Sequence, residues 1–437
     1  MADRIERMVL KFRDVLAATE RLEPDDLATY QQNLLVPLVK HARGQVPFYR
    51  NRLKPLFHGE EVDITEWRKV PILTRAEAQR NARALAARQM PPHAGKVEEE
   101  ETSGSTGRPF KHLRNELVEV AMLAATDRAL RWWDFDGNKS MASFVSRRRQ
   151  LAPPPDGAIV RGWRIGSSGL HYVLDMWADT DFQIDWLLAR RPHYLTAYSS
   201  ALLALAERAK IRGADLRFER IASTATAMSD EIRAACRDVF GAEPIDQYGA
   251  QEVGLIACEC PSCRRYHVNG ETVMVEIVNE DGMPCHPGDT GRVILTSLYN
   301  YAMPFIRYEI GDYATVGAAE SDCPIRLPTL SRILGRYRNT FTLSDGRILY
   351  PYVAIGRFRD FISFDQVQVV QTDYDKIEVR YVPLDDGDEA DERGLEIYLR
   401  DAIDSSFKVR AVVVQRIPRA ASGKFEDFLS LVSRHRS

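Results

Sequence analysis

The sequence predicts an α/β protein: a large N-terminal domain of helices and mostly parallel sheet, and a small α+β domain at the C-terminus. From about residue 215 onward, short β-like runs alternate with helical segments, the rhythm of parallel strands joined by helices. The last hundred residues instead follow the order strand, strand, helix, strand. With 437 residues, the chain is too long for one small domain, so two are expected.

Residues 1 to about 95 are expected to be helical with polar breaks. Within them, Thr74 is an N-cap and Glu77 follows three positions later, the pattern of a capping box. Apolar spacing predicts two further helices of the large domain, over residues 114–133 and 199–212.

The βαβ rhythm places a strand at residues 221–224, a helix over 229–240 and a strand at 244–248. Parallel strands end at one edge of their sheet, so a site is expected at their carboxyl ends. Residues 273–278 and 291–298 then follow as strand, turn, strand.

The small domain is expected to contain two strands, a helix and a third strand, at residues 367–370, 377–381, 395–407 and 409–417. Its boundary is placed within 335–339, which divides the chain into residues 1–335 and 336–437.

Composition excludes several classes of protein. The net charge is −3, from 59 basic and 62 acidic residues, which argues against a nucleic-acid partner. The N-terminus lacks the apolar core of a signal peptide, and no window resembles a membrane span. A cytoplasmic protein without a membrane partner is therefore expected. Its six cysteines favour metal binding or ordinary burial over disulfides.

One short segment alternates hydroxyl side chains with glycines: Thr102, Ser103, Gly104, Ser105, Thr106 and Gly107. Glycines let backbone amides turn toward an anion, and hydroxyls donate further hydrogen bonds to phosphate oxygens. No Walker sequence occurs in the chain. Taken alone, a flexible linker is an equally good interpretation.

Further along, Tyr248 can stack on a purine, and Glu252 is a hard oxygen ligand of the kind that Mg²⁺ prefers. Asp312 offers two oxygens for the hydroxyls of a ribose. Lys424 is a cation near the C-terminus. For each of these residues, an ordinary structural role is the alternative. Taken together, their chemistry is suited to binding ATP.

These segments resemble the motifs of the adenylate-forming (ANL) superfamily. Residues 102–109 resemble its phosphate loop, and Asp246 to Glu252 its D-x-Y-G-x-[TS]-E motif. The remaining matches are P-x-x-R-Y-x-x-G-D at 304–312, G-R-x-D-D at 335–339 and P-x-x-x-[ST]-G-K at 418–424. The resemblance implies a large adenylate-forming domain and a mobile C-terminal lid.

The resemblance also implies roles for individual residues. ATP would be bound by the phosphate loop and by Ala225, Thr226, Asp246, Gln247, Tyr248, Gly249, Gln251, Asp312 and Arg336. Catalytic roles fall to Glu252, which would hold magnesium, to Arg336, and to Lys424. Lys424 would stabilise charge on the α-phosphate as the lid closes.

The sequence departs from the family pattern at three places. Gln251 stands where the family has a hydroxyl, Arg338 stands at the hinge, and Ala225-Thr226 replace a T-G pair. These departures keep open a non-catalytic, nucleotide-binding interpretation.

A second cluster combines thiols with an imidazole. Cys258, Cys260, Cys263 and His267 lie within ten residues, and Cys323 can join them from a distant loop. Such ligands suit tetrahedral zinc. The pattern resembles the phenylacetate–CoA ligase branch, which implies a structural zinc on Cys260, Cys263, His267 and Cys323. Cys258 is the alternative ligand, and free buried thiols are the alternative to zinc.

The resemblance implies a two-step reaction. A carboxylic acid, aryl or arylalkyl in this branch, attacks Mg·ATP to give an acyl-adenylate and pyrophosphate, and a thiol, CoA above all, then displaces AMP. A carrier protein or an amine is the alternative acceptor. Trp132, Trp133 and Tyr198 are candidates for the acid pocket, with core packing as the alternative. The oligomeric state stays open, with a homodimer among the options.

Overall fold

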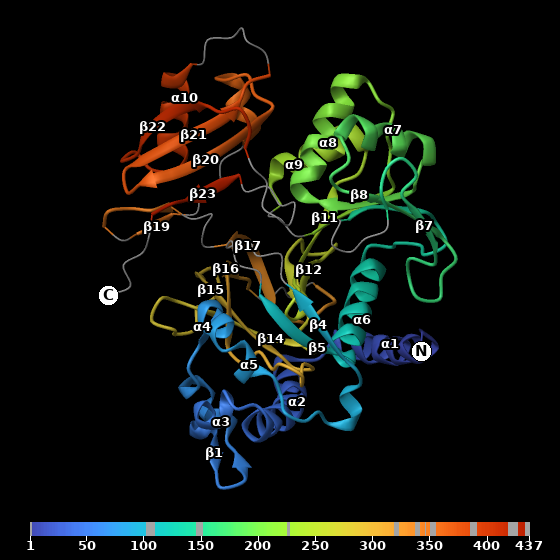
Figure 1. Ribbon diagram of the computed structural model, residues 1–437, viewed down its shortest axis with the longest axis vertical. Coiled ribbons are helices and arrows are strands. Elements are labelled where there is room, and N and C mark those ends of the chain that lie inside the picture. Colours follow the sequence, from blue (N-terminus) through green and yellow to red (C-terminus); the bar gives the residue numbers. More distant parts are fainter. Residues whose placement is uncertain are drawn as a thin grey trace.

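The computed structural model contains one large sheet flanked by helices and a smaller sheet built by the C-terminal residues (Figure 1). The predicted α/β class is confirmed. The structure describes residues 2–101, 110–145, 152–224, 228–318, 323–336, 341–345, 347–349, 355–384, 391–417 and 427–432.

The N-terminal segment is mainly helical, as predicted. Its helices are α1 (Ala2–Thr19), α2 (Pro24–Gln45), α3 (Tyr49–Arg52), α4 (Arg75–Arg80) and α5 (Ala82–Leu85). The predicted cap is confirmed, because the Thr74 hydroxyl accepts a hydrogen bond from the Glu77 amide at 3.2 Å. Among the described helices of the whole chain, none combines the length and apolarity needed to cross a bilayer.

The large sheet has the strand order β14-β15-β16-β17-β13-β12-β11-β10-β9-β6-β8-β7, with β3 added beside β16. Its first strands are β3 (Leu73–Thr74), β6 (Met141–Val145), β7 (Ala158–Arg161), β8 (Leu170–Asp175), β9 (Tyr194–Tyr198) and β10 (Arg220–Thr224). The remainder are β11 (Pro244–Ala250), β12 (Gly254–Glu259), β13 (Tyr266–Val268), β14 (Val273–Val278), β15 (Thr290–Ser297), β16 (Tyr308–Val316) and β17 (Thr329–Arg336). Two short hairpins lie outside it, β1 (Phe57–His58) with β2 (Glu61–Val62), and β4 (Val97–Glu101) with β5 (Lys111–Asn115).

Parallel pairing is concentrated in one block of this sheet, β8-β6-β9-β10-β11. Helices α7 (Thr180–Arg190), α8 (Ser199–Arg212) and α9 (Asp230–Phe240) connect strands of this block. Beyond β11 the strands follow one another without helices and pair antiparallel. A parallel return needs a long crossover, so the sheet is mixed where the sequence predicts a mostly parallel one.

The two faces of the parallel block pack against different helices. Ile221 of β10 lies in a buried cluster with residues of α7, α8 and α9. Its neighbour Ala222 lies in another cluster with residues of α1 and α6 (Glu116–Trp132). Successive side chains of a strand point to opposite faces, so the block is covered on both sides. In Figure 1, α6 lies below the block and α7, α8 and α9 lie above it.

The C-terminal unit has the predicted order of strands and helix. Its sheet runs β22-β21-β20-β23, and β18 (Phe341–Thr342) pairs with β19 (Ile348–Leu349). The elements of the unit are β20 (Gln366–Asp373), β21 (Lys376–Val382), α10 (Glu392–Ala402), β22 (Lys408–Val413) and β23 (Phe428–Ser430). Helix α10 ends five residues before the predicted end at 407. The Asp404 carboxylate accepts a hydrogen bond from the Ser406 amide, a local turn that competes with the helix.

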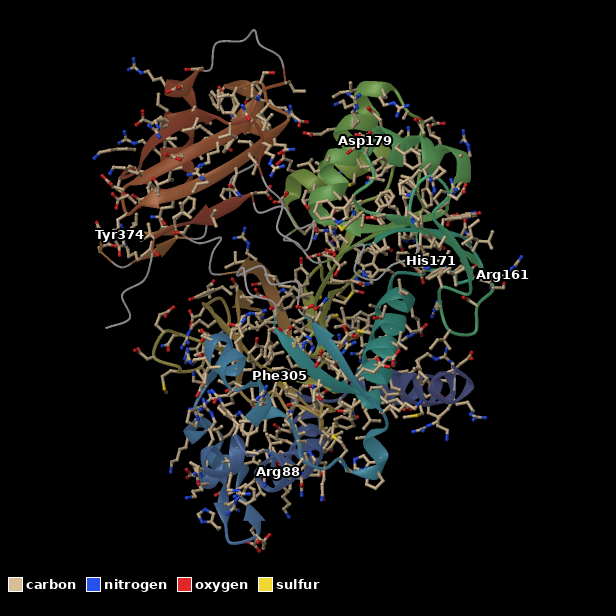
Figure 2. The ribbon with its side chains drawn as sticks, viewed as in Figure 1. Arg88, Arg161, His171, Asp179, Phe305 and Tyr374 are labelled. Atoms are coloured by element: carbon tan, nitrogen blue, oxygen red, sulfur yellow. The ribbon has the colours of Figure 1, made fainter. Side chains whose placement is uncertain are left out.

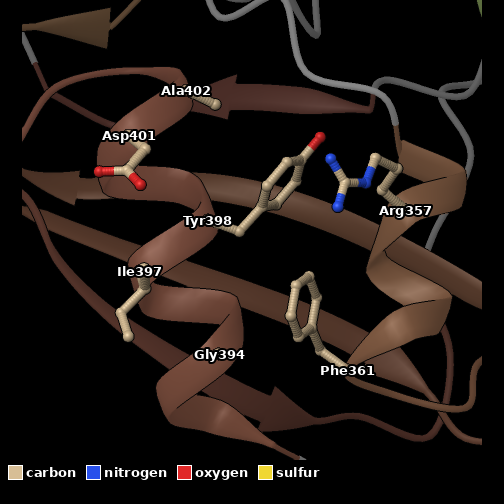
Figure 3. A pocket seen from close by; sticks show the side chains of 7 residues that line it. All are labelled: Arg357, Phe361, Gly394, Ile397, Tyr398, Asp401 and Ala402. Carbon is tan, nitrogen blue, oxygen red and sulfur yellow. The ribbon is translucent and has the colours of Figure 1, made fainter.

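This unit contacts the large one through an ion pair in which Arg359 lies 3.0 Å from Glu207 of α8. It also carries a hollow of about 560 Å³ between α10 and the short helix η6 (Ile355–Asp360). Figure 3 shows Tyr398 between Arg357 and the α10 backbone, with Phe361 below it. The residues lining the hollow include none of the predicted site residues, so the candidate site lies elsewhere.

A fully buried ion pair joins the N-terminal helices to the sheet. The Arg128 guanidinium of α6 donates to both oxygens of Glu271, at 2.6 and 3.1 Å. Glu271 also accepts from the Thr19 hydroxyl of α1 at 2.8 Å, and Arg128 donates to Asn269. Burying two charges is costly, but removing one partner costs more because the other charge is left unpaired.

We therefore expect Glu271→Gln to destabilise the protein by about 3–5 kcal/mol, as for other broken buried pairs. Denaturant unfolding followed by fluorescence would measure the change. The double variant Arg128→Met/Glu271→Leu removes both charges and should recover most of the loss. Equal stability of Glu271→Gln and the native chain would contradict the assigned role of the pair.

Candidate functional site

The carboxyl ends of the parallel strands lie at one level, as the βαβ rhythm predicts. Tyr198 of β9 pairs with Thr224 of β10, and Thr224 pairs with Gln247 of β11. Tyr198, a candidate for the acid pocket, therefore stands at the same sheet edge as Gln247, a predicted ATP contact. This is the edge at which ligands bind to parallel sheets.

Two predicted nucleotide contacts meet directly. The Tyr248 hydroxyl, at the end of β11, donates to an Asp312 carboxylate oxygen of β16 at 2.7 Å. Asp312 is in backbone register with Arg336 of β17, so this third predicted residue lies on the adjacent strand. Residues separated by up to 88 positions in the sequence therefore meet here, and an aromatic ring adjoins a carboxylate.

A tight reversal between β11 and β12 carries the predicted magnesium ligand. A β-bulge lies at Tyr248 and Gly249, and a Cβ on Gly249 would come within 3.0 Å of the Gly254 carbonyl. The Gln251 carbonyl that follows accepts hydrogen bonds from His112 at 3.2 Å and from Arg114 at 3.4 Å. A side chain at Gly249 would therefore require a small shift of the Gly254 backbone, whereas the Gln251 carbonyl is fixed by β5.

His112 and Arg114 belong to β5, which pairs with β4 on the other side of the predicted phosphate loop. Burial lowers the pKa of His112, so the ring is neutral at neutral pH. In the sequence, the predicted loop lies between Glu101, the last residue of β4, and Lys111, the first residue of β5. The structure thus brings the flank of the loop to the turn that carries Glu252.

Arg75 is a contact of Glu252 that the sequence analysis missed. Its guanidinium donates to the Glu252 carboxylate at 2.8 Å and to the Tyr308 hydroxyl at 3.2 Å. Both members of the pair are buried, with side chains 12% and 4% exposed. The one signal in the sequence was indirect: Arg75 follows the N-cap Thr74, which fixes its place in the first turn of α4.

Asp246 is placed differently from its predicted role as a direct ATP contact. Its oxygens accept hydrogen bonds from Ser223 at 2.9 Å and from Tyr266 at 2.8 Å. Burial raises the pKa of Asp246 to about 6. The carboxylate therefore faces the protein interior, where it ties β11 to β10 and β13.

The residues present fit a magnesium ion. The side-chain oxygen of Gln251 is buried and has no hydrogen-bond partner within the part of the chain that the structure describes. A buried acceptor without a donor is costly, and a bound cation would satisfy it. Because Glu252 is the next residue, an amide oxygen and a carboxylate lie in one turn, and both are hard ligands.

The Cys–His cluster is assembled as the spacing predicts. The ligand atoms of Cys260, Cys263, His267 and Cys323 all lie within 4.8 Å of one another. The Cys260 and Cys323 sulfurs are 3.7 Å apart, and the His267 Nε2 atom is 3.3 Å from the Cys323 sulfur. Tetrahedral zinc with bonds of about 2.3 Å to sulfur requires sulfurs about 3.8 Å apart. The cluster therefore fits zinc, and its cysteines are not joined by disulfides.

The imidazole of the cluster is oriented for a metal. His267 Nδ1 lies 2.9 Å from the Leu327 carbonyl, so Nδ1 carries the proton and Nε2 is free to ligate. Cys258, the alternative ligand, is buried in the cluster of α1 and α6 residues instead. Trp132 packs edge-on against His267 and Trp133 donates to the Glu259 carbonyl, so both support this region rather than an acid pocket.

Several predicted residues lie outside the described part of the chain. They are Thr102, Ser103, Gly104, Ser105, Thr106, Gly107, Ala225, Thr226, Arg338 and Lys424. Of Arg336, the structure describes the backbone in β17.

Two curated proteins are similar to the chain in sequence. The phenylacetate-coenzyme A ligase of Thermus thermophilus is 25% identical over 339 residues, which cover 72% of each chain. The enzyme of the same name from Pseudomonas putida is 26% identical over 322 residues, or 69% of each chain. No family model matches the chain.

Among solved structures, a 2-hydroxyisobutyryl-CoA ligase in the postadenylation state superposes with a TM-score of 0.72 at 15% identity. The match covers 94% of this chain and 91% of the ligase. At 15% identity, the comparison supports similarity of the fold alone. In sequence and in fold, the chain is similar to the adenylate-forming CoA ligases, and within them to the phenylacetate–CoA ligase branch, which confirms the resemblance of its motifs.

Proposed function

We propose that the protein activates a carboxylic acid with Mg·ATP, giving an acyl-adenylate and pyrophosphate, and then transfers the acyl group to the thiol of CoA with release of AMP. The observation that carries this proposal is the meeting of Tyr248 and Asp312 beside the turn of Gln251 and Glu252. The similarity to phenylacetate-coenzyme A ligases over most of the chain supports it.

Different residues bind different parts of the nucleotide. Tyr248 presents a ring face to the purine, while Asp312, whose carboxylate has two acceptor oxygens, accepts hydrogen bonds from the ribose hydroxyls. Gln251 and Glu252 would hold the magnesium ion, which would supply positive charge to the phosphates. Arg75 fixes the Glu252 carboxylate in the turn and compensates its charge.

We propose that residues 1–335 form the adenylation domain and residues 336–437 the mobile lid. The lid brings Lys424 to the α-phosphate, where a fixed positive charge stabilises the charge that develops as pyrophosphate leaves. The backbone of Arg336 stands at the boundary, in register with Asp312, and we propose that Arg336 contacts the ribose or the phosphates. Positioning and electrostatics carry the reaction, and no side-chain nucleophile is needed.

The acid is proposed to be aryl or arylalkyl, on the similarity to the phenylacetate branch. The acceptor is proposed to be CoA, with a carrier-protein thiol or an amine as alternatives. The enzyme is proposed to act in the cytoplasm, where ATP and CoA are supplied.

The decisive experiment is acid-dependent pyrophosphate release from Mg·ATP across aryl, arylalkyl and small aliphatic acids, with and without CoA. We expect release with one class of acid, and AMP together with a thioester only when CoA is present. If an acyl product forms with an amine or a carrier protein but not with CoA, that molecule, and not CoA, is the acceptor. ATP binding with no turnover for any acid would favour the non-catalytic interpretation.

We expect Asp312→Ala to raise the KM for ATP about 10- to 100-fold, because charge-assisted hydrogen bonds contribute about 1.5–3 kcal/mol each. Tyr248→Phe keeps the ring and loses only the hydroxyl, so it should raise the KM much less than Tyr248→Ala. Initial-rate kinetics at saturating acid measure both. An unchanged KM for Asp312→Ala would remove Asp312 from the nucleotide site.

We further propose that the Cys–His cluster holds one structural zinc ion. Four protein ligands fill a tetrahedral site, so no position is open for substrate or water. The ion would tie the reversal after β12 to the segment before β17, and the strand β16 that carries Asp312 lies between these two segments in the sequence.

Metal analysis of purified protein is expected to find one zinc per chain, and its removal by a chelator should lower the melting temperature by about 5–10 °C. Cys260→Ser and Cys323→Ser should each reduce the zinc content, whereas Cys258→Ala should retain it. If Cys258→Ala loses zinc while Cys323→Ser retains it, Cys258 is a ligand in place of Cys323. Protein without zinc would refute the site.

A further inference from the structure

A second serine–histidine contact lies apart from the nucleotide residues. The Ser143 hydroxyl of β6 is 2.8 Å from Nε2 of His171 on β8. Ser143 is buried, and His171 is partly buried. Met141, two residues before Ser143, packs in the cluster formed by α1 and α6, so Ser143 points to the same face of the sheet. Figure 2 shows His171 between the outer strands of the large sheet and α6.

The backbone register places this pair close to the edge where the acid must react. Ser143 pairs with Thr196 of β9, and Thr196 pairs with Ala222 of β10. The edge residue Thr224 is two positions further along β10, a rise of about 7 Å. An acid whose carboxylate lies at the edge and whose tail follows the α6 side of the sheet would therefore reach Ser143.

The hydrogen-bonding groups next to Ser143 on this face are uncharged. Burial lowers the pKa of His171, so its ring is neutral and offers one donor and one acceptor. Thr196 uses its hydroxyl on the Met141 sulfur at 3.5 Å, a weak acceptor. The Arg164 guanidinium is paired with Asp127 of α6, so its charge is compensated. Such a surface suits a neutral hydroxyl better than a second carboxylate.

We infer that Ser143 and His171 are specificity-determining residues that hydrogen-bond a hydroxyl group on the tail of the acid. The substrate class is therefore hydroxylated aryl or arylalkyl acids rather than their unsubstituted parents. This inference rests on the proposed adenylation activity. A site that pairs with a substrate hydroxyl discriminates against the analogue without it, because its own polar groups are then left unpaired.

The test compares kcat/KM for pyrophosphate release with phenylacetate and its three monohydroxy isomers, and with benzoate and its isomers. We expect at least one hydroxylated acid to exceed its parent tenfold or more. Ser143→Ala and His171→Phe should reduce this ratio about tenfold or more, mainly by lowering the rate with the hydroxylated acid. His171→Gln, which keeps hydrogen-bonding groups, should preserve part of it.

The chain provides a matched control. Ser140 and His193 form a similar pair at 2.9 Å, but Ser140 is partly exposed and His193 exposed, and they precede β6 and β9, at the opposite edge of the sheet. Ser140→Ala and His193→Gln should leave the ratio unchanged. Because each ratio compares two acids on one protein, a loss of folded protein cancels from it.

Two results would overturn the inference while leaving the proposed function intact. One is equal kcat/KM for parents and hydroxylated acids in the native chain. The other is a parallel loss with both acids in Ser143→Ala. Pyrophosphate release with none of the acids, despite bound ATP, would instead count against adenylation itself, and the specificity assignment would be lost with it.

Discussion

The chain reversal between β11 and β12 is the constraint on which the candidate site depends. It ends the parallel block of the sheet and begins the antiparallel part, so it is the place where both parts supply side chains. The turn is fixed at its backbone, because the His112 and Arg114 side chains of β5 hydrogen-bond to the Gln251 carbonyl. With the turn fixed, Tyr248 reaches Asp312 on one side and Glu252 reaches Arg75 on the other.

Buried charges connect the N-terminal helices to this arrangement at two points. Arg75 of α4 pairs with Glu252 in the turn, and Arg128 of α6 pairs with Glu271 beyond β13. Charges taken out of water tolerate little displacement, because an unpaired partner is strongly destabilising. Helices α4 and α6 therefore belong to the framework of the site, and α4 lies within the first hundred residues, where no family motif was found.

The sequence predicted elements whose signals are local. The N-cap at Thr74, the helices with apolar periodicity and the thiol spacing around Cys260 needed no knowledge of the fold. Through the family resemblance it also assigned Tyr248 and Asp312 to one nucleotide site, but not the hydrogen bond between them. The contact of Arg75 with Glu252 and the inward orientation of Asp246 could not be read from it. Both depend on which strands become neighbours, a property of the whole sheet that no window of residues contains.

The position of the Cys–His cluster bears on how the gene for this protein can be recombined. Its ligands come from one stretch ending at His267 and from Cys323, and the intervening residues include β14, β15 and β16. A crossover placed between these stretches would combine ligands and strands from different parents. Breakpoints before β11 and after β17 would instead keep the cluster, the reversal between β11 and β12, and Asp312 within one inherited block. Grafting of nucleotide-binding segments among relatives should therefore treat residues 244–336 as indivisible.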